Sequence, residues 1–264
     1  MDTLQYQAIK AVSKNQDFVE DTVVVEAALQ ININEEPYTV VMRTPGSDFE
    51  LIRGLLFAED IYKRKLPLNC SSVKEEKSVP SIINCSIPLK ELGKGYLNKR
   101  TLLSVSSCGI CGKQELKDIE LTGDQLTNIR KISNKDIQNM QAQMQEVQAT
   151  FHKSGGSHAA AVFDENLNML CTQEDIGRHN AVDKCVGDLL NNEQLEMGQY
   201  LLVSGRVSYE IISKAFFAKI PIVIAVSACS SLAIDFAKEF GICLIGFSRD
   251  DKMTIYANPQ YISL

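Results

Sequence analysis

The sequence predicts an α/β protein with a three-layer α/β/α domain in its C-terminal half and a smaller, strand-rich α+β domain before it. Two observations support this prediction. In the second half, short apolar runs alternate with amphipathic stretches of helical period, which is typical of a sheet covered on both faces. In the first half, strand-like runs are separated by turn residues. We place the boundary near residues 131–133, which gives domains 1–132 and 133–264.

The N-terminal half predicts a hairpin, a helix and a less regular region. Apolar β-formers occupy residues 23–31 and 38–42, and a turn-prone segment joins them. Ser47 and Glu50 form a capping-box pattern, so a helix is expected from there to about Ile61. Residues 63–99 are polar and interrupted by prolines, and their path is not predicted. The expected strand 101–105 leads directly into the segment Cys108-Gly-Ile-Cys-Gly112.

The C-terminal half alternates more regularly. A second capping pattern, Ser133 to Asp136, begins a helix whose apolar face runs to Phe151. Two strands follow it, joined by a turn. Helices and strands then alternate to the end of the chain. The expected strands are 158–163, 167–171, 200–203, 222–226, 242–247 and 254–257, and the expected helices are 178–190, 208–218 and 231–240.

Composition excludes several functional classes. The chain has 264 residues, 45% of them apolar and 23% charged, so it can bury a real core. No apolar run approaches the roughly 20 residues that cross a bilayer, and the polar start does not resemble a secretion signal. A cytoplasmic location without a membrane partner is therefore expected. The net charge of −6 argues against nucleic acid as the main partner.

The eight cysteines divide into a close pair and six others. In a cytosolic chain of this length, reduced thiols are expected rather than a disulfide framework. Cys171, Cys185 and Cys243 lie in apolar or periodic stretches and are expected to be buried. Only Cys108 and Cys111 form a Cys-x-x-Cys pair. Cys70, Cys85 and Cys229 have no partner at metal-ligand spacing.

Polar clusters follow the predicted strands, where ligands bind in open α/β sheets. We expect these clusters to converge. Glycine-arginine turns after strands suit phosphate groups, because arginine presents a planar fork and glycine lets backbone N–H groups approach. Capping and surface pairing is the competing interpretation for Glu174, Asp175, Asn180 and Arg178. His152 is expected to be structural, whereas His158 and His179 are site candidates. The four clusters are residues 154–158, 174–180, 204–208 and 246–250.

The Cys-x-x-Cys pair alone is ambiguous. A zinc site would need two further ligands at suitable spacing, and the sequence offers no second Cys or His pair, so no metal is expected. Glycine follows both cysteines, which favours an exposed loop over a thioredoxin-like helix start. Thiol redox chemistry and a sulfur relay through a thiolate both remain open on residue chemistry.

Several segments, in order, resemble the FdhD family of formate dehydrogenase accessory sulfurtransferases. The most specific is Glu174-Asp-Ile-Gly-Arg-His-Asn-Ala-Val-Asp-Lys184. The others are Cys108-Gly-Ile-Cys-Gly112, Gly155-Gly-Ser-His-Ala159, Ser204-Gly-Arg206, Gly246-Phe-Ser-Arg249 and Arg43-Thr-Pro-Gly46 with Glu50, Leu51 and Gly54. The likeness runs from about Val23 to Tyr256. Ser154 and Cys229 depart from the family's usual Thr and Pro.

The resemblance implies a function. A cysteine desulfurase would pass sulfur to Cys108 as a persulfide, with Cys111 auxiliary. The protein, as a homodimer, would deliver that sulfur to the molybdenum of bis(molybdopterin guanine dinucleotide) for formate dehydrogenase. A guanine nucleotide could occupy the same site. The implied cofactor-binding segment is Phe247, Ser248, Arg249, Asp250, Asp251 and Lys252, and the polar clusters add His158, Arg178, His179 and Arg206.

The order of elements in the second half is also similar to the cytidine deaminase fold. A zinc deaminase needs His-x-Glu and Pro-Cys-x-x-Cys segments at two helix starts. The corresponding positions here read His179-Asn180-Ala181 and Ser204 to Ser208, so zinc hydrolysis is not expected. Two functions remain open: a sulfurtransferase acting through Cys108, and a chaperone that binds the molybdenum cofactor without transferring sulfur.

Overall fold

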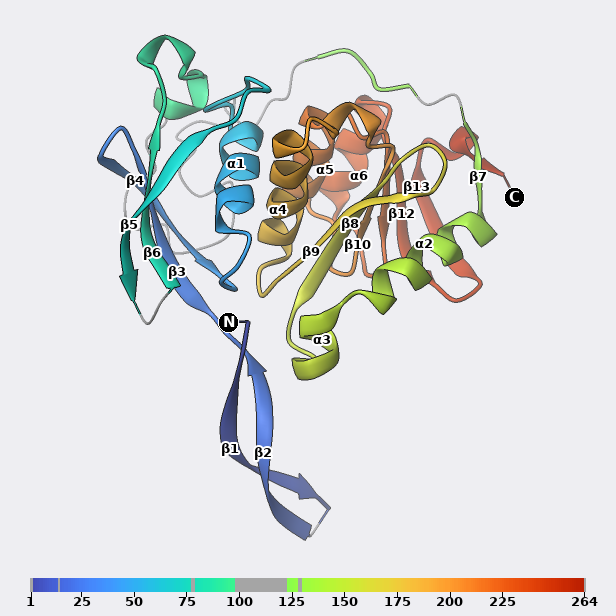
Figure 1. The fold of residues 1–264 in the computed structure, drawn as a ribbon. Helices are drawn as coiled ribbons and strands as arrows, with labels where there is room; N and C mark the ends of the chain where they lie inside the picture. The colour runs from blue at the N-terminus through green and yellow to red at the C-terminus, as the bar shows by residue number, and fades with distance from the viewer. Residues whose placement is uncertain (1, 14, 77–78, 98–122, 128–129, 264) are drawn as a thin grey trace.

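The computed structural model describes residues 2–13, 15–76, 79–97, 123–127 and 130–263. It contains a protruding hairpin, a small sheet with one helix, and a larger mixed sheet with helices on both faces (Figure 1). The predicted mixed α/β class is confirmed. The expected strand 101–105 and both cysteines of the Cys-x-x-Cys pair lie outside the described residues, and the domain boundary stays a prediction. None of the described helices is long and apolar enough to cross a membrane.

The N-terminal hairpin consists of β1 (Thr3–Val12) and β2 (Asn15–Val24), which are antiparallel along their whole length. Its base is closed by a hydrogen bond of 2.8 Å from Val25 N to the carbonyl of Asp2. The expected single strand 23–31 is therefore wrong. Its first residues close this hairpin, and the chain then enters a different sheet at Ala27.

The small sheet has the order β4-β3-β6-β5. Apolar side chains on one of its faces pack against α1 (Asp48–Ala58) in a shared core. The expected hairpin is confirmed, with its turn at Asn34 and Glu35, both of which have positive φ. Residues 63–99 supply the two remaining strands. The strands are β3 (Ala27–Ile33), β4 (Glu36–Arg43), β5 (Asn69–Glu76) and β6 (Val79–Ser86), followed by 3-10 turns η1 (Leu89–Glu91) and η2 (Lys94–Leu97).

The expected capping box at α1 is wrong. Ser47 adopts a left-handed conformation with φ 51°, and its side chain makes no capping hydrogen bond. Asp48, the first helical residue, instead accepts hydrogen bonds from the buried guanidinium of Arg43 at 2.8 and 3.2 Å. The helix also ends at Ala58 rather than near Ile61. The start of α1 is thus fixed by an ion pair to β4.

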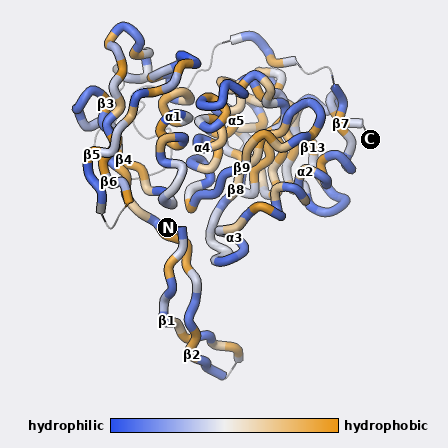
Figure 2. Tube along the Cα trace, viewed as in Figure 1, coloured by the Kyte–Doolittle hydropathy of each residue, from blue (hydrophilic) through white to orange (hydrophobic). Residues whose placement is uncertain are grey.

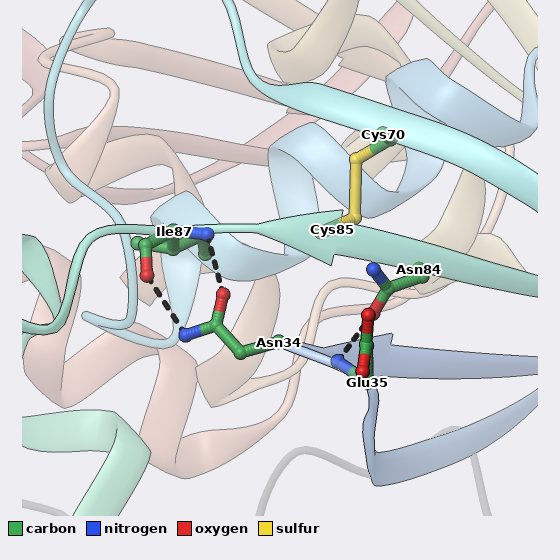
Figure 3. The surroundings of a disulfide bond; sticks show 6 residues. All are labelled: Asn34, Glu35, Cys70, Asn84, Cys85 and Ile87. Carbon is green, nitrogen blue, oxygen red and sulfur yellow. Dashed lines mark hydrogen bonds between the residues drawn. A yellow bond between two sulfur atoms is a disulfide. The ribbon is translucent and has the colours of Figure 1, made fainter.

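Cys70 and Cys85 form a disulfide between β5 and β6 (Figure 3). The expectation of reduced thiols is wrong for this pair, because the antiparallel register places the two residues directly opposite each other. Their separation of 15 residues in sequence gave no sign of that register. Close by, the Asn34 side chain bonds the backbone N and O of Ile87, each at 2.8 Å.

The larger sheet has the order β13-β12-β11-β10-β8-β9. Its three consecutive strands β10, β11 and β12 are parallel, and the outer pairings are antiparallel. The predicted strands are confirmed, with shifted ends in several. They are β8 (His158–Phe163), β9 (Met169–Asp175), β10 (Tyr200–Val203), β11 (Ile222–Ala225), β12 (Cys243–Arg249) and β13 (Lys252–Ala257).

Helices cover both faces of this sheet. Alternate side chains of β10 show the two layers: Leu201 and Val203 join the core under α4, α5 and α6, whereas Tyr200 and Leu202 join the core under α2. The helices are α2 (Asn134–Glu146), α4 (Arg178–Asn191), α5 (Tyr209–Phe217) and α6 (Ser231–Glu239), with the short strands β7 (Ile132–Ser133) and β14 (Ile262–Ser263) beside α2 and 3-10 turns η4 (Leu195–Met197) and η5 (Pro259–Tyr261).

The helix expected to run to Phe151 is two helices. The capping box of Ser133 and Asp136 is confirmed at the start of α2. However, α2 ends at Glu146, and α3 (Ala149–Ser154) follows. Val147 and Phe151, which continued the apolar pattern, are each 43% exposed. The periodicity thus continued beyond the buried face.

The small sheet and the large sheet are joined through α1 and α4, which pack side by side (Figure 1). A Cβ on Gly54 would lie 1.9 Å from the Asp183 carbonyl oxygen, and one on Gly187 would lie 1.9 Å from that of Glu50. Both glycines are therefore required by close backbone approach. Phe57, near the end of α1, also belongs to the core of the larger sheet.

Candidate functional site

The loops after β10 and β11 and the end of β12 are linked to one another at one edge of the larger sheet. Val207 N donates to the Ala228 carbonyl at 2.9 Å, and Phe247 N donates to the Ser227 carbonyl at 3.0 Å. Arg249 Nε reaches the Val226 carbonyl at 3.0 Å. We call this region the strand-end edge: residues 204–208, 226–230 and 246–252, with His158 and Arg178.

His158 and Arg178 meet the first of these loops at Gly205. A Cβ on Gly205 would lie 3.1 Å from Arg178 Cβ and 3.3 Å from His158 Nδ1. Ser204 Oγ accepts a hydrogen bond of 2.9 Å from Ala159 N, which fixes this loop against the start of β8. The absence of a side chain at Gly205 thus lets three polar segments converge.

The surroundings of His158 are electropositive. Burial lowers the pKa of His158 below its usual 6.5, and the positive charges of Arg178 and Arg206 lower it further, against the opposing effect of Asp175. Arg178 Nε is buried and has no hydrogen-bond partner among the described residues. Arg206 is exposed. An imidazole with a lowered pKa near two arginines suits an anionic or hydrogen-bonding ligand.

His179 lies inside the protein rather than on this surface. Its Nε2 is 3.1 Å from Ser208 Oγ and 3.0 Å from a carboxylate oxygen of the buried Glu210. The imidazole therefore connects the start of α4 to the loop before α5. Ser208 belongs to the predicted cluster 204–208, whereas sequence reasoning missed Glu210, because a polar residue at a helix start looks like an ordinary capping residue.

The segment implied as cofactor-binding divides into two parts. Phe247 and Arg249 alternate outward and are exposed, with Phe247 at a positive φ of 50°. Ser248 between them is buried, and both its hydroxyl and its carbonyl accept hydrogen bonds from Gln141 of α2, at 2.9 and 2.7 Å. Only Phe247 and Arg249 of these three thus face outward.

The turn that follows is also tied to α2. The carbonyl of Asp250 accepts a hydrogen bond of 2.5 Å from Gln138, and that of Asp251 accepts one of 3.2 Å from Asn134. Lys252 begins β13 and is exposed. The backbone of the turn is therefore held in place, while the charged side chains lie at the surface.

The most specific sequence segment supplies a buried polar cluster centred on Asp175. One carboxylate oxygen accepts hydrogen bonds from Gly177 N at 2.8 Å and from Asn180 Nδ2 at 2.9 Å. The other accepts one from Thr44 N at 3.1 Å and forms an ion pair of 2.8 Å with Lys184 Nζ. This cluster joins α4 to the segment after β4, because Thr44 belongs to the small-sheet part of the chain.

The capping interpretation is confirmed for Glu174, although it caps a different helix. Its carboxylate accepts hydrogen bonds of 2.8 Å from Thr150 N and Phe151 N at the start of α3. No ion pair joins Arg178 to a carboxylate within the described part of the chain. His152 contacts the Gln145 carbonyl at 2.7 Å and has the structural position expected of it.

The free cysteines differ in their surroundings. Cys171, Cys185 and Cys243 are buried as predicted. Burial raises the pKa of Cys243 to about 12. Cys229 is half-buried at the strand-end edge, with its sulfur 2.9 Å from where a Cβ on Gly246 would lie. Burial raises the pKa of Cys229 to about 11, so this thiol is a poor nucleophile.

Comparisons with known proteins agree with one another. The model of the FdhD/NarQ family matches residues 24–263. A protein of Sulfolobus acidocaldarius named "Sulfur carrier protein FdhD" is 38% identical over 246 residues, which cover 93% of this chain and 92% of that protein. Proteins of the same name from Mycobacterium tuberculosis and Picrophilus torridus are 38% and 37% identical, with coverage of at least 92% of both chains.

The fold matches a solved structure as well. The crystal structure of a formate dehydrogenase accessory protein from Desulfotalea psychrophila superposes with a TM-score of 0.77 over 100% of both chains. The two sequences are 17% identical, so this likeness concerns the fold alone.

Proposed function

Since this chain belongs to the FdhD/NarQ family, we propose that it is a sulfur carrier that serves a formate dehydrogenase. The observation that carries the proposal is the 38% identity to proteins named as sulfur carriers, over more than nine-tenths of both chains. The proposal includes a cysteine desulfurase as donor, a cytoplasmic location and a homodimer, which the resemblance or the sequence led us to expect.

In the proposed reaction, Cys108 carries the sulfur. Its thiolate attacks the outer sulfur of the donor's persulfide, a new S–S bond forms on Cys108, and the donor cysteine leaves as a thiolate. On delivery, the outer sulfur leaves Cys108 as a neutral atom and the Cys108 thiolate is restored. The acceptor supplies the two electrons of its new bond to sulfur.

We propose that the acceptor, the molybdenum of bis(molybdopterin guanine dinucleotide), is bound with its nucleotide end at the strand-end edge. Three features support this placement: the Nε of Arg178, which has no hydrogen-bond partner among the described residues, the space left by Gly205, and the outward-facing Phe247 and Arg249. Arginine forks suit phosphate oxygens. We also propose that the C-terminal half has a cytidine deaminase-like fold, because the strand-end edge of such a sheet suits a nucleotide.

Mass spectrometry tests the sulfur step. The protein is incubated with a cysteine desulfurase and cysteine, and the peptide that contains Cys108 is expected to gain the mass of one sulfur atom. Cys108→Ser should abolish this gain, whereas Cys229→Ser should leave it intact, because the raised pKa of Cys229 makes it a poor acceptor. A wild-type protein that never gains sulfur would refute the relay.

The alternative function is a chaperone that binds the cofactor without transferring sulfur. The strand-end edge supports both functions equally, because both require a cofactor-binding surface. The chaperone function predicts cofactor binding with no sulfur adduct. Both functions predict that Arg249→Ala weakens binding of a guanine nucleotide, measured by calorimetry. Lys238→Ala is the matched control. The start of α6 adjoins the strand-end edge, and Lys238 lies in the last turn of that helix, at its other end. Equal affinity in both variants would remove Arg249 from the site.

A further inference from the structure

The hairpin of β1 and β2 exposes an unusual amount of apolar surface. Phe18 is 85% exposed, Tyr6 and Ile9 are each 56% exposed, and hydrophobic stretches run along both strands (Figure 2). The remaining exposed apolar side chains of the hairpin are Leu4, Val12 and Val23. The hairpin itself projects away from both sheets (Figure 1). Nothing within the described part of the chain covers this surface.

Among the residues that the structure describes, only the base of the hairpin contacts the rest of the protein. Asp2 accepts a hydrogen bond of 2.9 Å from Thr150 Oγ1 and lies 4.0 Å from Lys153 Nζ, both in α3. Val24 lies against Gly156, just after that helix. Beyond this base, the two strands pair with each other and with no other described strand, and an isolated two-stranded hairpin is marginally stable in water. The extended arm therefore needs a further contact.

The two outer edges of the hairpin differ in charge. β2 carries Asp17, Glu20 and Asp21, and such charges protect an edge strand from pairing with another chain. Over its ten residues β1 carries one charge, that of Lys10, and it has no proline. The unpaired backbone groups of β1 are thus open to another strand. Pairing through β2 would bring carboxylates of two chains together.

We propose that the β1 edge joins two copies of this chain, with β1 of one copy antiparallel to β1 of the other. Antiparallel pairing of a strand with its own copy has twofold symmetry, as a homodimer requires. Four of the six exposed apolar side chains of the hairpin lie on β1, next to the proposed contact: Leu4, Tyr6, Ile9 and Val12. Removing apolar surface of β1 from water by pairing with a second copy favours association.

The inference gives a surface to the proposed homodimer and does not depend on sulfur transfer. In the resulting four-stranded ribbon the order is β2-β1-β1-β2. Adjacent strands are about 4.8 Å apart, so equivalent residues on the two β2 strands are separated by about 14 Å. A disulfide requires Cα atoms within about 7 Å. Cysteines on β1 can therefore cross-link, and cysteines on β2 cannot.

Cysteine cross-linking in the full chain tests this arrangement. Tyr6→Cys, Ala8→Cys and Lys10→Cys lie on one face of β1, and Val19→Cys lies directly opposite Ala8 on β2. Under mild oxidation at least one β1 variant is expected to form covalent dimers well above the wild-type background, and Val19→Cys is not. Dimers from Val19→Cys alone, or from none of the variants, would overturn the β1 pairing.

Sedimentation gives an independent result. The wild type is expected to have the mass of two 29.3 kDa chains at micromolar concentration. Ile9→Lys is expected to raise the dissociation constant at least tenfold. Met197→Lys, at an exposed apolar residue in η4, is the control and should leave it unchanged. A wild-type monomer would overturn the inference and the homodimer together. A dimer whose dissociation constant is unaffected by Ile9→Lys would overturn the β1–β1 contact but not the homodimer.

Discussion

Lys184→Met should strongly destabilise the protein, because it leaves a buried carboxylate without its counter-ion. Lys184 and Asp175 are 2% and 0% exposed, and their ion pair is 2.8 Å long. Lys184 also donates to the carbonyls of Thr44 and Glu174, at 2.9 and 3.3 Å. Removing one partner of a buried pair costs about 3–5 kcal/mol. We therefore expect a loss of about 4 kcal/mol, a large share of an ordinary domain's stability.

Urea denaturation measures this loss as a fall in the midpoint at constant slope. Lys65→Met is the matched control: Lys65 also pairs with a glutamate, Glu196, but the two side chains are 61% and 80% exposed. Its loss should be far smaller, because water screens an exposed pair. If Lys184→Met costs less than about 1 kcal/mol, or no more than Lys65→Met, the buried pair does not hold these segments together.

A second variant separates the charge from the packing. Asp175→Asn removes the carboxylate charge and keeps an oxygen acceptor. In the double variant with Lys184→Met neither charge of this pair remains, so the combined loss should fall short of the sum of the single losses by at least about 1 kcal/mol. Strict additivity would mean that the two side chains act independently.

Three further predictions follow from individual contacts. Gly54→Ala should cost about 3 kcal/mol or more in urea denaturation, since its Cβ would overlap the Asp183 carbonyl at 1.9 Å. Arg206→Ala should raise the pKa of His158 in an NMR titration toward 6.5; because the wild-type pKa is lowered, His158 opposes folding as pH falls below 6.5. Alkylation of Cys229 at pH 8 should be roughly two orders of magnitude slower than that of free cysteine, given its pKa of about 11. An unchanged His158 titration, a harmless Gly54→Ala or a fast Cys229 would each contradict the contact concerned.

The sequence predicted the elements in the C-terminal half of the chain well and those in the N-terminal half poorly. β8 and β10 have the predicted bounds, because a strand buried on both faces is a short apolar run between polar turns. The β1–β2 hairpin was missed, since its strands are exposed and mix polar with apolar residues. The Cys70–Cys85 disulfide was missed for another reason. It depends on the register of β5 and β6, which periodicity does not reveal.

The candidate site shows a similar division. Convergence of the polar loops followed from the parallel order of β10 to β12, and the structure brings those loops together. Individual roles within them could not be predicted, because a polar residue near a strand end can face either way. His179, on α4, lies inside. On β12, Ser248 lies inside whereas Phe247 and Arg249 face outward, because successive side chains of a strand point to opposite faces.

The buried cluster around Asp175 positions Arg178, a residue of the proposed nucleotide site. The segment from Glu174 to Lys184 carries Arg178, which we propose as a ligand contact. The Nε of Arg178 has no hydrogen-bond partner in the described part of the chain. Asp175 bonds Gly177 N immediately before Arg178, and it bonds Thr44 N from the other sheet. The contact between the two parts of the protein therefore also sets the start of α4. It follows that a variant such as Lys184→Met should weaken guanine-nucleotide binding as well as stability, although Lys184 itself lies buried beneath the segment that carries Arg178.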